Sequence, residues 1–155
     1  MKKKFIVITL VAVALFVLAP SPAPAQGGVK QGPDVVRDPD MEKDSLHNLE
    51  VARQYFTLRK AYKASLARCE EIIAGNPTFS KIDEVLLIAG KSSLRLSENK
   101  GKQSVKTATD KLRGDARDYL SMLVNNYPDS RFKGDALEEL KPLGGPLPKD
   151  NGSKQ

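Results

Sequence analysis

Between residues 49 and 77 the chain carries an apolar pattern that predicts two helices folded against each other. The apolar side chains recur at steps of three and four residues on either side of the polar pair Arg59 and Lys60: Leu49, Ala52, Phe56, Tyr62, Leu66, Cys69, Ile72 and Ile73. This spacing is typical of helices with one apolar face. Pro77 cannot continue a helix, so the second helix is expected to end near Ala74 or Gly75. One hairpin of this size leaves its apolar face half covered and needs a similar neighbour.

Three further helices are predicted after Pro77. The first is capped by Ser80, the second runs from about residue 104 to 125 after a polar turn at 97–103, and the third runs from about residue 131 to 140. Their inward-facing residues are Ile82, Val85, Leu86, Ala89, Ser93 and Leu96, then Val105, Ala108, Leu112, Ala116, Tyr119, Leu120 and Leu123, then Phe132, Ala136, Leu137 and Leu140. The predicted fold class is therefore all-α, with about five helices in a domain of residues 45–141. The first helix is expected to begin near Leu46, capped by Asp44 or Ser45.

The regions outside this domain have different compositions. Lys2, Lys3 and Lys4 precede an apolar run over residues 5–18, and a small-x-small pattern ends at Ala25, which is the organisation of a secretory signal peptide, residues 1–25. The run is shorter than the roughly 20 residues that span a bilayer, so a retained anchor is the less favoured alternative. Residues 26–44 are rich in Gly, Pro and charge and are expected to form a flexible linker. Residues 142–155 are expected to form a disordered tail, because their prolines and glycines forbid further helix.

The charge balance argues against a nucleic-acid partner. Removal of the three signal-peptide lysines lowers the formal net charge from +6 to +3, whereas nucleic-acid binders carry dense basic stripes. Basic residues do gather along the turn and the fourth predicted helix, where acidic residues intersperse them: Lys100, Lys102, Lys106, Lys111, Arg113 and Arg117, with Asp110, Asp115 and Asp118. This mixture favours a solvated face and leaves an anionic partner or lipid headgroup as the alternative.

The sequence offers little material for catalysis or metal binding. His47 is the only histidine, and Cys69 is the only cysteine and lies on an apolar face, where a buried structural thiol is expected. Asp34, Asp38 and Asp40 have a spacing slightly like that of a calcium loop, but neighbouring prolines and the missing distal glutamate favour a solvated linker. We therefore expect no catalytic residue, metal or cofactor, and no enzyme.

The chain also contains an internal repeat. Aligning Pro77 with Pro128, 51 residues later, pairs Ser65 with Ala116, Cys69 with Leu120, Ile72 with Leu123 and Ile73 with Val124. Two helices that each end at a proline therefore share one inward face. The period is longer than the roughly 34 residues of a tetratricopeptide unit, so the second copy is expected to have longer helices or a longer turn.

These residues resemble a known family. The segment KAYKAS at 60–65, Ile72-Ile73, Asn76-Pro77 and Tyr127-Pro128-Asp129-Ser130 are similar to the tetratricopeptide units of the BamD-like outer-membrane assembly lipoproteins. The family pattern is Gly-x-aromatic-x-x-Ala followed by a Tyr-Pro-x-Ser stop. Tyr62, Ser65 and Ala116 stand at matching positions. Lys60 and Lys111 replace the turn glycine, Arg113 replaces the second aromatic residue, and the lipidation cysteine is absent.

The resemblance implies an exported protein–protein interaction scaffold, in the periplasm or on the periplasmic face of the outer membrane. Its partners would be envelope assembly components, with peripheral membrane association and self-association as further expectations, because two repeats leave an open edge. The alternative is a periplasmic tetratricopeptide adaptor for cell-envelope or peptidoglycan machinery, and a hydrolase accessory domain is a third. Candidate partner-binding residues are Tyr55, Arg59 and Tyr62, which lie near the first turn and could line a groove for an extended peptide. Core packing explains the two tyrosines equally well.

Overall fold

The computed structural model describes residues 37–103 and 106–149, and all secondary-structure elements in this part of the chain are helical. The elements are α1 (Pro39–Gln54), a π-helical turn (Tyr55–Arg59), α2 (Tyr62–Gly75), α3 (Ile82–Ser97), α4 (Thr109–Asn126), α5 (Lys133–Leu140) and a short 3-10 turn (Lys141–Leu143). The all-α prediction is confirmed. The expected signal peptide lies outside the described residues, as does the first part of the expected linker.

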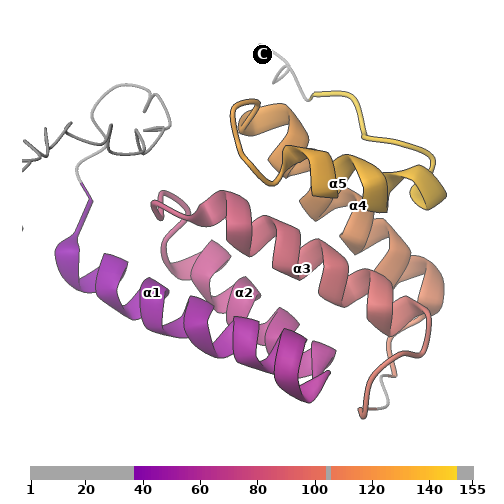
Figure 1. Cartoon of the computed structure of the whole chain (residues 1–155), viewed down its shortest axis with the longest axis horizontal. Helices are drawn as coiled ribbons and strands as arrows, with labels where there is room; N and C mark the ends of the chain where they lie inside the picture. The colour runs from indigo at the N-terminus through magenta and orange to yellow at the C-terminus, as the bar shows by residue number, and fades with distance from the viewer. Residues whose placement is uncertain (1–36, 104–105, 150–155) are drawn as a thin grey trace, which may run out of the picture.

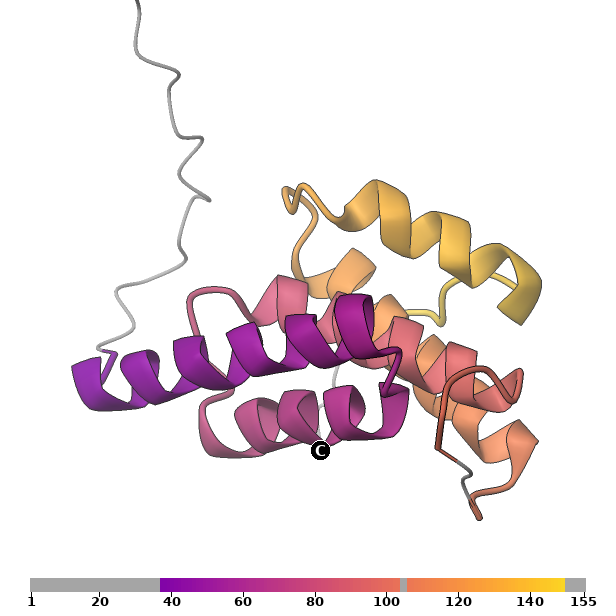
Figure 2. The same cartoon turned by 60° about the horizontal axis from the view of Figure 1, so that its bottom comes forward.

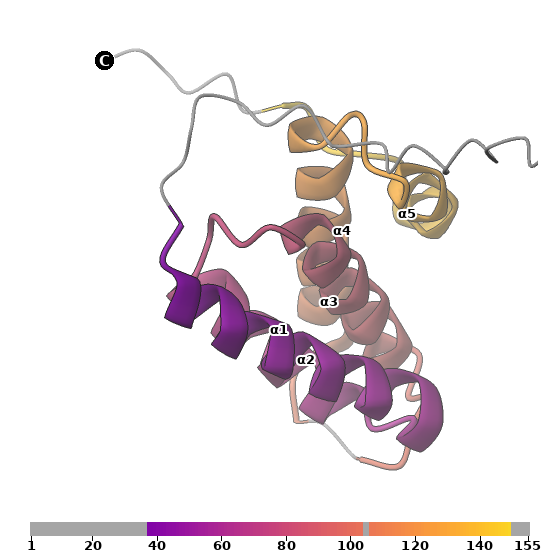
Figure 3. The ribbon, with the colours of Figure 1, turned by 60° about the vertical axis from the view of Figure 1, so that its left-hand side comes forward.

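The helices form two layers (Figure 1). Helices α1, α3 and α5 lie side by side in one layer, and α2 and α4 lie behind them, as the turned views also show (Figures 2 and 3). Helix α3 sits in the middle and packs against both α2 and α4. We expected α3 to bury a single apolar stripe, which is wrong, because its central position buries nearly every residue from Ile82 to Ser97.

Helix α1 begins earlier than the sequence analysis predicted. It starts at Pro39, and Asp38 is its cap, with the Asp38 Oδ1 accepting hydrogen bonds from the backbone N–H groups of Asp40 at 2.9 Å and Met41 at 3.3 Å. Proline fits the first helical position because its missing N–H has no helical acceptor there. The end of the expected linker, residues 39–44, is therefore helical. Ser45 is buried and accepts a hydrogen bond from Asn76 instead of capping α1.

The core divides into two clusters on either side of α3. One joins α1, α2 and α3 and contains Leu49, Cys69, Ile72, Phe79 and Val85 among others. The second joins α3, α4 and α5 around residues that include Leu86, Leu120, Leu123, Ala136 and Leu140. The predicted inward faces of α2 and α4 are thereby confirmed at their central positions. Leu137, predicted to face inward, is 37% exposed.

The 51-residue repeat is visible in the backbone. After α2, the N–H of Phe79 bonds the carbonyl of Asn76 and the N–H of Ile82 bonds that of Phe79, each at 3.1 Å. After α4, the N–H of Ser130 bonds Tyr127 at 3.0 Å and the N–H of Lys133 bonds Ser130 at 3.1 Å, which is the same pattern 51 residues later. The residues that end the two helices also share a backbone conformation, with φ −141°, ψ 73° at Asn76 and φ −126°, ψ 64° at Tyr127.

Two other predicted boundaries need correction. Helix α4 begins at Thr109, not near residue 104, so Ala108 is exposed and precedes the helix. Ser80 does not cap α3, which begins after Lys81 without a side-chain cap. In the second copy the connection between the helices is longer than in the first, as the length of the repeat indicated.

Candidate binding surface

The three predicted partner-binding residues lie at one end of the molecule, where α1 turns into α2. The guanidinium of Arg59 lies 5.6 Å from the ring centre of Tyr55, which is within the range of a cation–π contact. Tyr62 instead packs edge-on against Phe56, with ring centres 5.2 Å apart. Both tyrosines are half-buried and Arg59 is exposed, so the structure brings the three residues to the same turn but orients Tyr62 toward the hairpin itself.

The turn itself has an unusual backbone. The π-helical turn ends at Lys60, which is left-handed with φ 51° and ψ 34°, and the N–H of Ala61 closes the turn on the carbonyl of Tyr55 at 2.9 Å. A left-handed residue with a side chain costs roughly 1–2 kcal/mol, whereas glycine adopts this conformation freely. Lys60 is the position at which the resembled family pattern has its glycine. The equivalent Lys111 lies inside α4 and has no such conformation.

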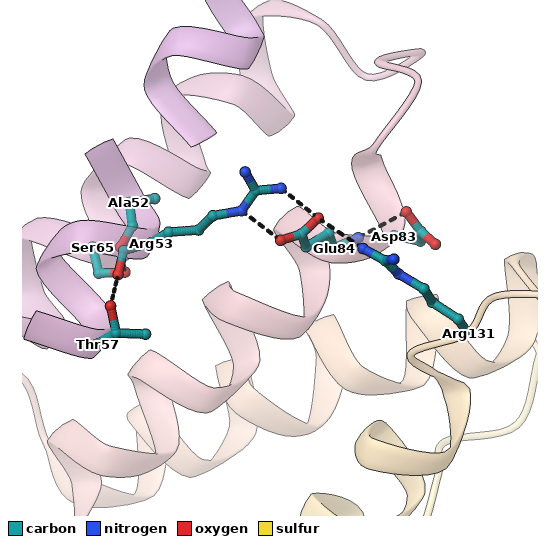
Figure 4. Close-up of polar contacts among 7 residues, drawn as sticks. All are labelled: Ala52, Arg53, Thr57, Ser65, Asp83, Glu84 and Arg131. Atoms are coloured by element: carbon teal, nitrogen blue, oxygen red, sulfur yellow. Dashed lines mark hydrogen bonds and ion pairs between the residues drawn. The ribbon is translucent and has the colours of Figure 1, made fainter. Parts of the chain in front are cut away.

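A line of charged side chains crosses the layer of α1, α3 and α5 (Figure 4). Arg53 of α1 donates two hydrogen bonds to the Glu84 carboxylate of α3, from Nε at 2.6 Å and from Nη2 at 2.7 Å. Arg131, just before α5, approaches the same carboxylate from the other side at 3.9 Å. The hydrogen bond to Glu84 raises the pKa of the Arg53 guanidinium. A bidentate ion pair of this kind fixes the orientation of both the guanidinium and the carboxylate.

Further polar contacts tie the same helices together. The Ser130 hydroxyl donates to the Asp83 carboxylate at 2.6 Å, so the second proline turn is bonded to the start of α3. Along the layer, Arg95 of α3 donates to the Glu139 carboxylate of α5 at 2.8 Å. The two arginines that contact Glu84 remain accessible to solvent, since the side chains of Arg53 and Arg131 are 37% and 78% exposed. An arginine of α1, a glutamate of α3 and an arginine just before α5 thus form a row of charge across this layer.

The C-terminal segment is held along α4, contrary to the expected disordered tail. Four side chains of α4, spaced four residues apart, form hydrogen bonds with the main chain of this segment. Arg113 donates to the Pro142 carbonyl at 2.9 Å, and Arg117 donates to the Gly145 and Gly144 carbonyls at 2.8 and 3.1 Å. The Ser121 hydroxyl accepts from the Leu147 N–H at 2.8 Å, and Asn125 donates to the Leu147 carbonyl at 2.9 Å. The segment runs along α4 in the same direction. Beside it lies a hollow of about 440 Å³, lined in part by Met122, Leu147 and Pro148.

This contact changes the interpretation of the basic residues on the fourth predicted helix. Arg113 and Arg117 bind the C-terminal segment, and Lys111 pairs with Asp115 at 2.7 Å. These three residues therefore make contacts within the molecule and do not form a free basic face. Sequence reasoning missed the contact, although four polar residues at steps of four were a visible signal.

The residues considered for chemistry take structural or surface positions. His47 is exposed on α1. Cys69 is fully buried, and burial raises the pKa of its thiol far above the ordinary value, as expected for a structural thiol. Within residues 37–103 and 106–149, no three His, Cys, Asp or Glu side chains come together as a metal site would require. No helix in this described part is both long and apolar enough to cross a bilayer.

Comparison with models of protein families, with curated proteins and with solved structures gives no match for this chain. The resemblance to the BamD-like proteins therefore rests on the residues of the two proline-terminated hairpins.

Proposed function

We propose that this chain is an exported, non-enzymatic scaffold that binds other proteins, and that it is a BamD-like component or accessory of outer-membrane protein assembly. The observation that carries the proposal is the charged row across α1, α3 and α5. Stacked helical hairpins bind partners through extended surfaces to which several repeats contribute. The row joins α1, α3 and the residue just before α5 through the Glu84 carboxylate and leaves its two arginines in contact with solvent.

Two features support the tetratricopeptide-type, BamD-like assignment. The turn after each proline repeats its hydrogen bonds at an interval of 51 residues, so the two copies share the backbone of this turn and not only an apolar pattern. The residue that replaces the family's turn glycine, Lys60, has the left-handed conformation that glycine favours. Localisation in the periplasm and envelope assembly partners follow from the resemblance and the signal-peptide pattern.

The test is site-specific photo-crosslinking in the native envelope. A photoreactive residue replaces Arg131, at one end of the charged row, or Glu50, which precedes Arg53 by three residues on α1, and a matched control replaces the exposed Ala67 on α2 in the other layer. We expect adducts with components of the barrel-assembly machinery from the first two positions and not from Ala67. Adducts with peptidoglycan enzymes would favour the adaptor alternative. Adducts from Ala67 alone, or none from the row, would refute the proposed surface.

A further inference from the structure

Two segments at one end of the molecule gather basic side chains around a protruding leucine. The segments are residues 58–63, between α1 and α2, and residues 98–103, after α3, and we refer to them together as the basic tip. They carry one carboxylate, Glu98, and five basic side chains: Arg59, Lys60, Lys63, Lys100 and Lys102. All six of these residues are exposed. Only Lys100 is paired with Glu98 among these, at 2.9 Å in the described structure.

The two segments form one surface because their backbones touch. A side-chain carbon added to Gly101 would lie 2.8 Å from the carbonyl oxygen of Lys60 and 2.9 Å from the ring of Tyr62. Only glycine permits so close an approach, and Gly101 also has a positive φ of 104°. Figures 1 and 3 show both connections at the same end of the helix layers.

Leu58 is the most exposed large apolar side chain in the described part of the chain, at 80%, whereas the next are at 43%. Leu58 lies within the π-helical turn, two residues before the left-handed Lys60. Single exposed leucines are common on protein surfaces. This one differs because its own segment carries Arg59, Lys60 and Lys63, and because Gly101 brings the second basic segment against the backbone of Lys60.

We propose that the basic tip docks on an anionic lipid bilayer. Leu58 enters the boundary between headgroups and acyl chains, and the basic side chains contact headgroup phosphates. A bilayer offers Leu58 a continuous apolar layer directly beneath the anionic headgroups, which matches an exposed leucine set among basic residues. At the other end of α1, Asp38, Asp40 and Glu42 would be repelled by an anionic surface, so the charge distribution also sets the orientation. This inference is independent of the proposed scaffold role.

The experiment uses a fluorescent reporter at the tip. The chain has no tryptophan, so Leu58→Trp in the full chain places a unique fluorophore there, and Leu137→Trp on α5 is the matched control. Emission is measured with vesicles of phosphatidylcholine alone and with phosphatidylglycerol added, with and without brominated acyl chains. We expect a blue shift and quenching of the Leu58→Trp emission only with the anionic vesicles, and no change for Leu137→Trp. Because the two variants share the same N-terminal region, that region cannot produce a difference between them.

Charge removal gives the second readout. Each basic side chain near an anionic surface contributes about fivefold in affinity, so Arg59→Gln, Lys60→Gln and Lys63→Gln together should weaken the vesicle response by about a hundredfold. The helical circular-dichroism signal should stay unchanged, because all three side chains are exposed. An equal response of the two tryptophan variants, an equal response to neutral vesicles, or a response to polyglutamate but not to vesicles would overturn the proposal. The last result would indicate an acidic protein partner.

Discussion

Gly90 lies where α3 packs directly against α4, and replacing it tests the central packing of the fold. A side-chain carbon at this position would lie 2.5 Å from Cγ of Leu120, 2.8 Å from its Cδ2 and 3.2 Å from the carbonyl oxygen of Ala116. Leu120 is fully buried, so its side chain has no open space into which it could move. Gly90→Ala therefore forces either a shift of Leu120 or a separation of the two helices.

The magnitude follows from two opposed effects. Overpacking of a filled core costs typically about 1–3 kcal/mol. Alanine in a helix interior is favoured over glycine by about 0.8–1.0 kcal/mol, which offsets part of this cost. Because Leu120 cannot escape, we expect the upper part of the range and a net destabilisation of about 1–2 kcal/mol for Gly90→Ala.

Gly114 provides the matched control. It lies inside α4, with nothing within 4 Å of an added side-chain carbon. Gly114→Ala therefore has the gain in helix propensity without the clash, and we expect stabilisation by about 0.5–1 kcal/mol. Urea unfolding followed by circular dichroism measures both variants. Equal stabilisation by the two substitutions would refute the close approach of α3 and α4 at Gly90.

A double-mutant cycle tests the assignment of the clash to Leu120. Leu120→Ala alone removes a buried side chain and should cost about 2–5 kcal/mol. In its presence the alanine at position 90 no longer meets a leucine, so the double variant should be more stable than the sum of the single effects predicts. Simple additivity would show that the strain lies elsewhere.

Four further predictions address the turn, the charged row, the C-terminal segment and the pH dependence. Lys60→Gly should stabilise the fold by about 0.5–1 kcal/mol in urea unfolding, because it relieves a left-handed lysine; destabilisation would contradict the turn. Arg53→Met should cost about 1–2 kcal/mol, because the nearly buried Glu84 carboxylate loses its two-pronged partner; an unchanged urea midpoint would count against the pair. Asn125→Ala should speed amide hydrogen exchange in residues 144–148 but not in α1, whereas equal rates would argue against docking. Burial, with a smaller effect of a neighbouring glutamate, raises the pKa of Tyr119 to about 12, above the value near 10 of an exposed phenol. The neutral phenol therefore contributes to the free energy of unfolding fully below pH 10, and this contribution is lost as the pH rises toward 12. Thermal unfolding should show a smaller alkaline loss for Tyr119→Phe, and an equal loss would exclude this tyrosine as the cause.

Local signals in the sequence were sufficient for the helices whose ends are set by proline. Pro77 and Pro128 fixed the ends of α2 and α4, and the apolar steps identified Cys69 and Leu120 as core residues. The same reasoning failed for α1, because Asp38 and Pro39 were interpreted as linker residues. An aspartate followed by proline fits a linker, but it equally fits a helix cap followed by the first helical residue. Only the packing of α1 on α2 distinguishes the linker from the helix start.

The burial of α3 on nearly all sides could not be deduced from its own residues. Its polar Ser92 lies outside the predicted apolar stripe and suggests an exposed face, yet it is fully buried because α1 and α2 cover one side of α3 and α4 and α5 cover the other. The burial of a helix depends on the number of neighbours, which the stacking order decides. The apolar stripe reveals only one of these contacts.

The docked C-terminal segment changes the expectation that the chain self-associates through an open edge of the helix stack. Two hairpins alone would leave both ends of the helix stack uncovered, which was the reason to expect self-association. The four bonded side chains of α4 hold residues 142–147 along this helix, so the C-terminal end has a cover supplied by the chain itself. The corresponding side of α2 has no such cover among the described residues and is marked only by a shallow hollow beside Ala64 and Ala67. Any self-association should therefore involve the α1–α2 side, and removal of residues 144–155 should be needed before α4 joins another copy.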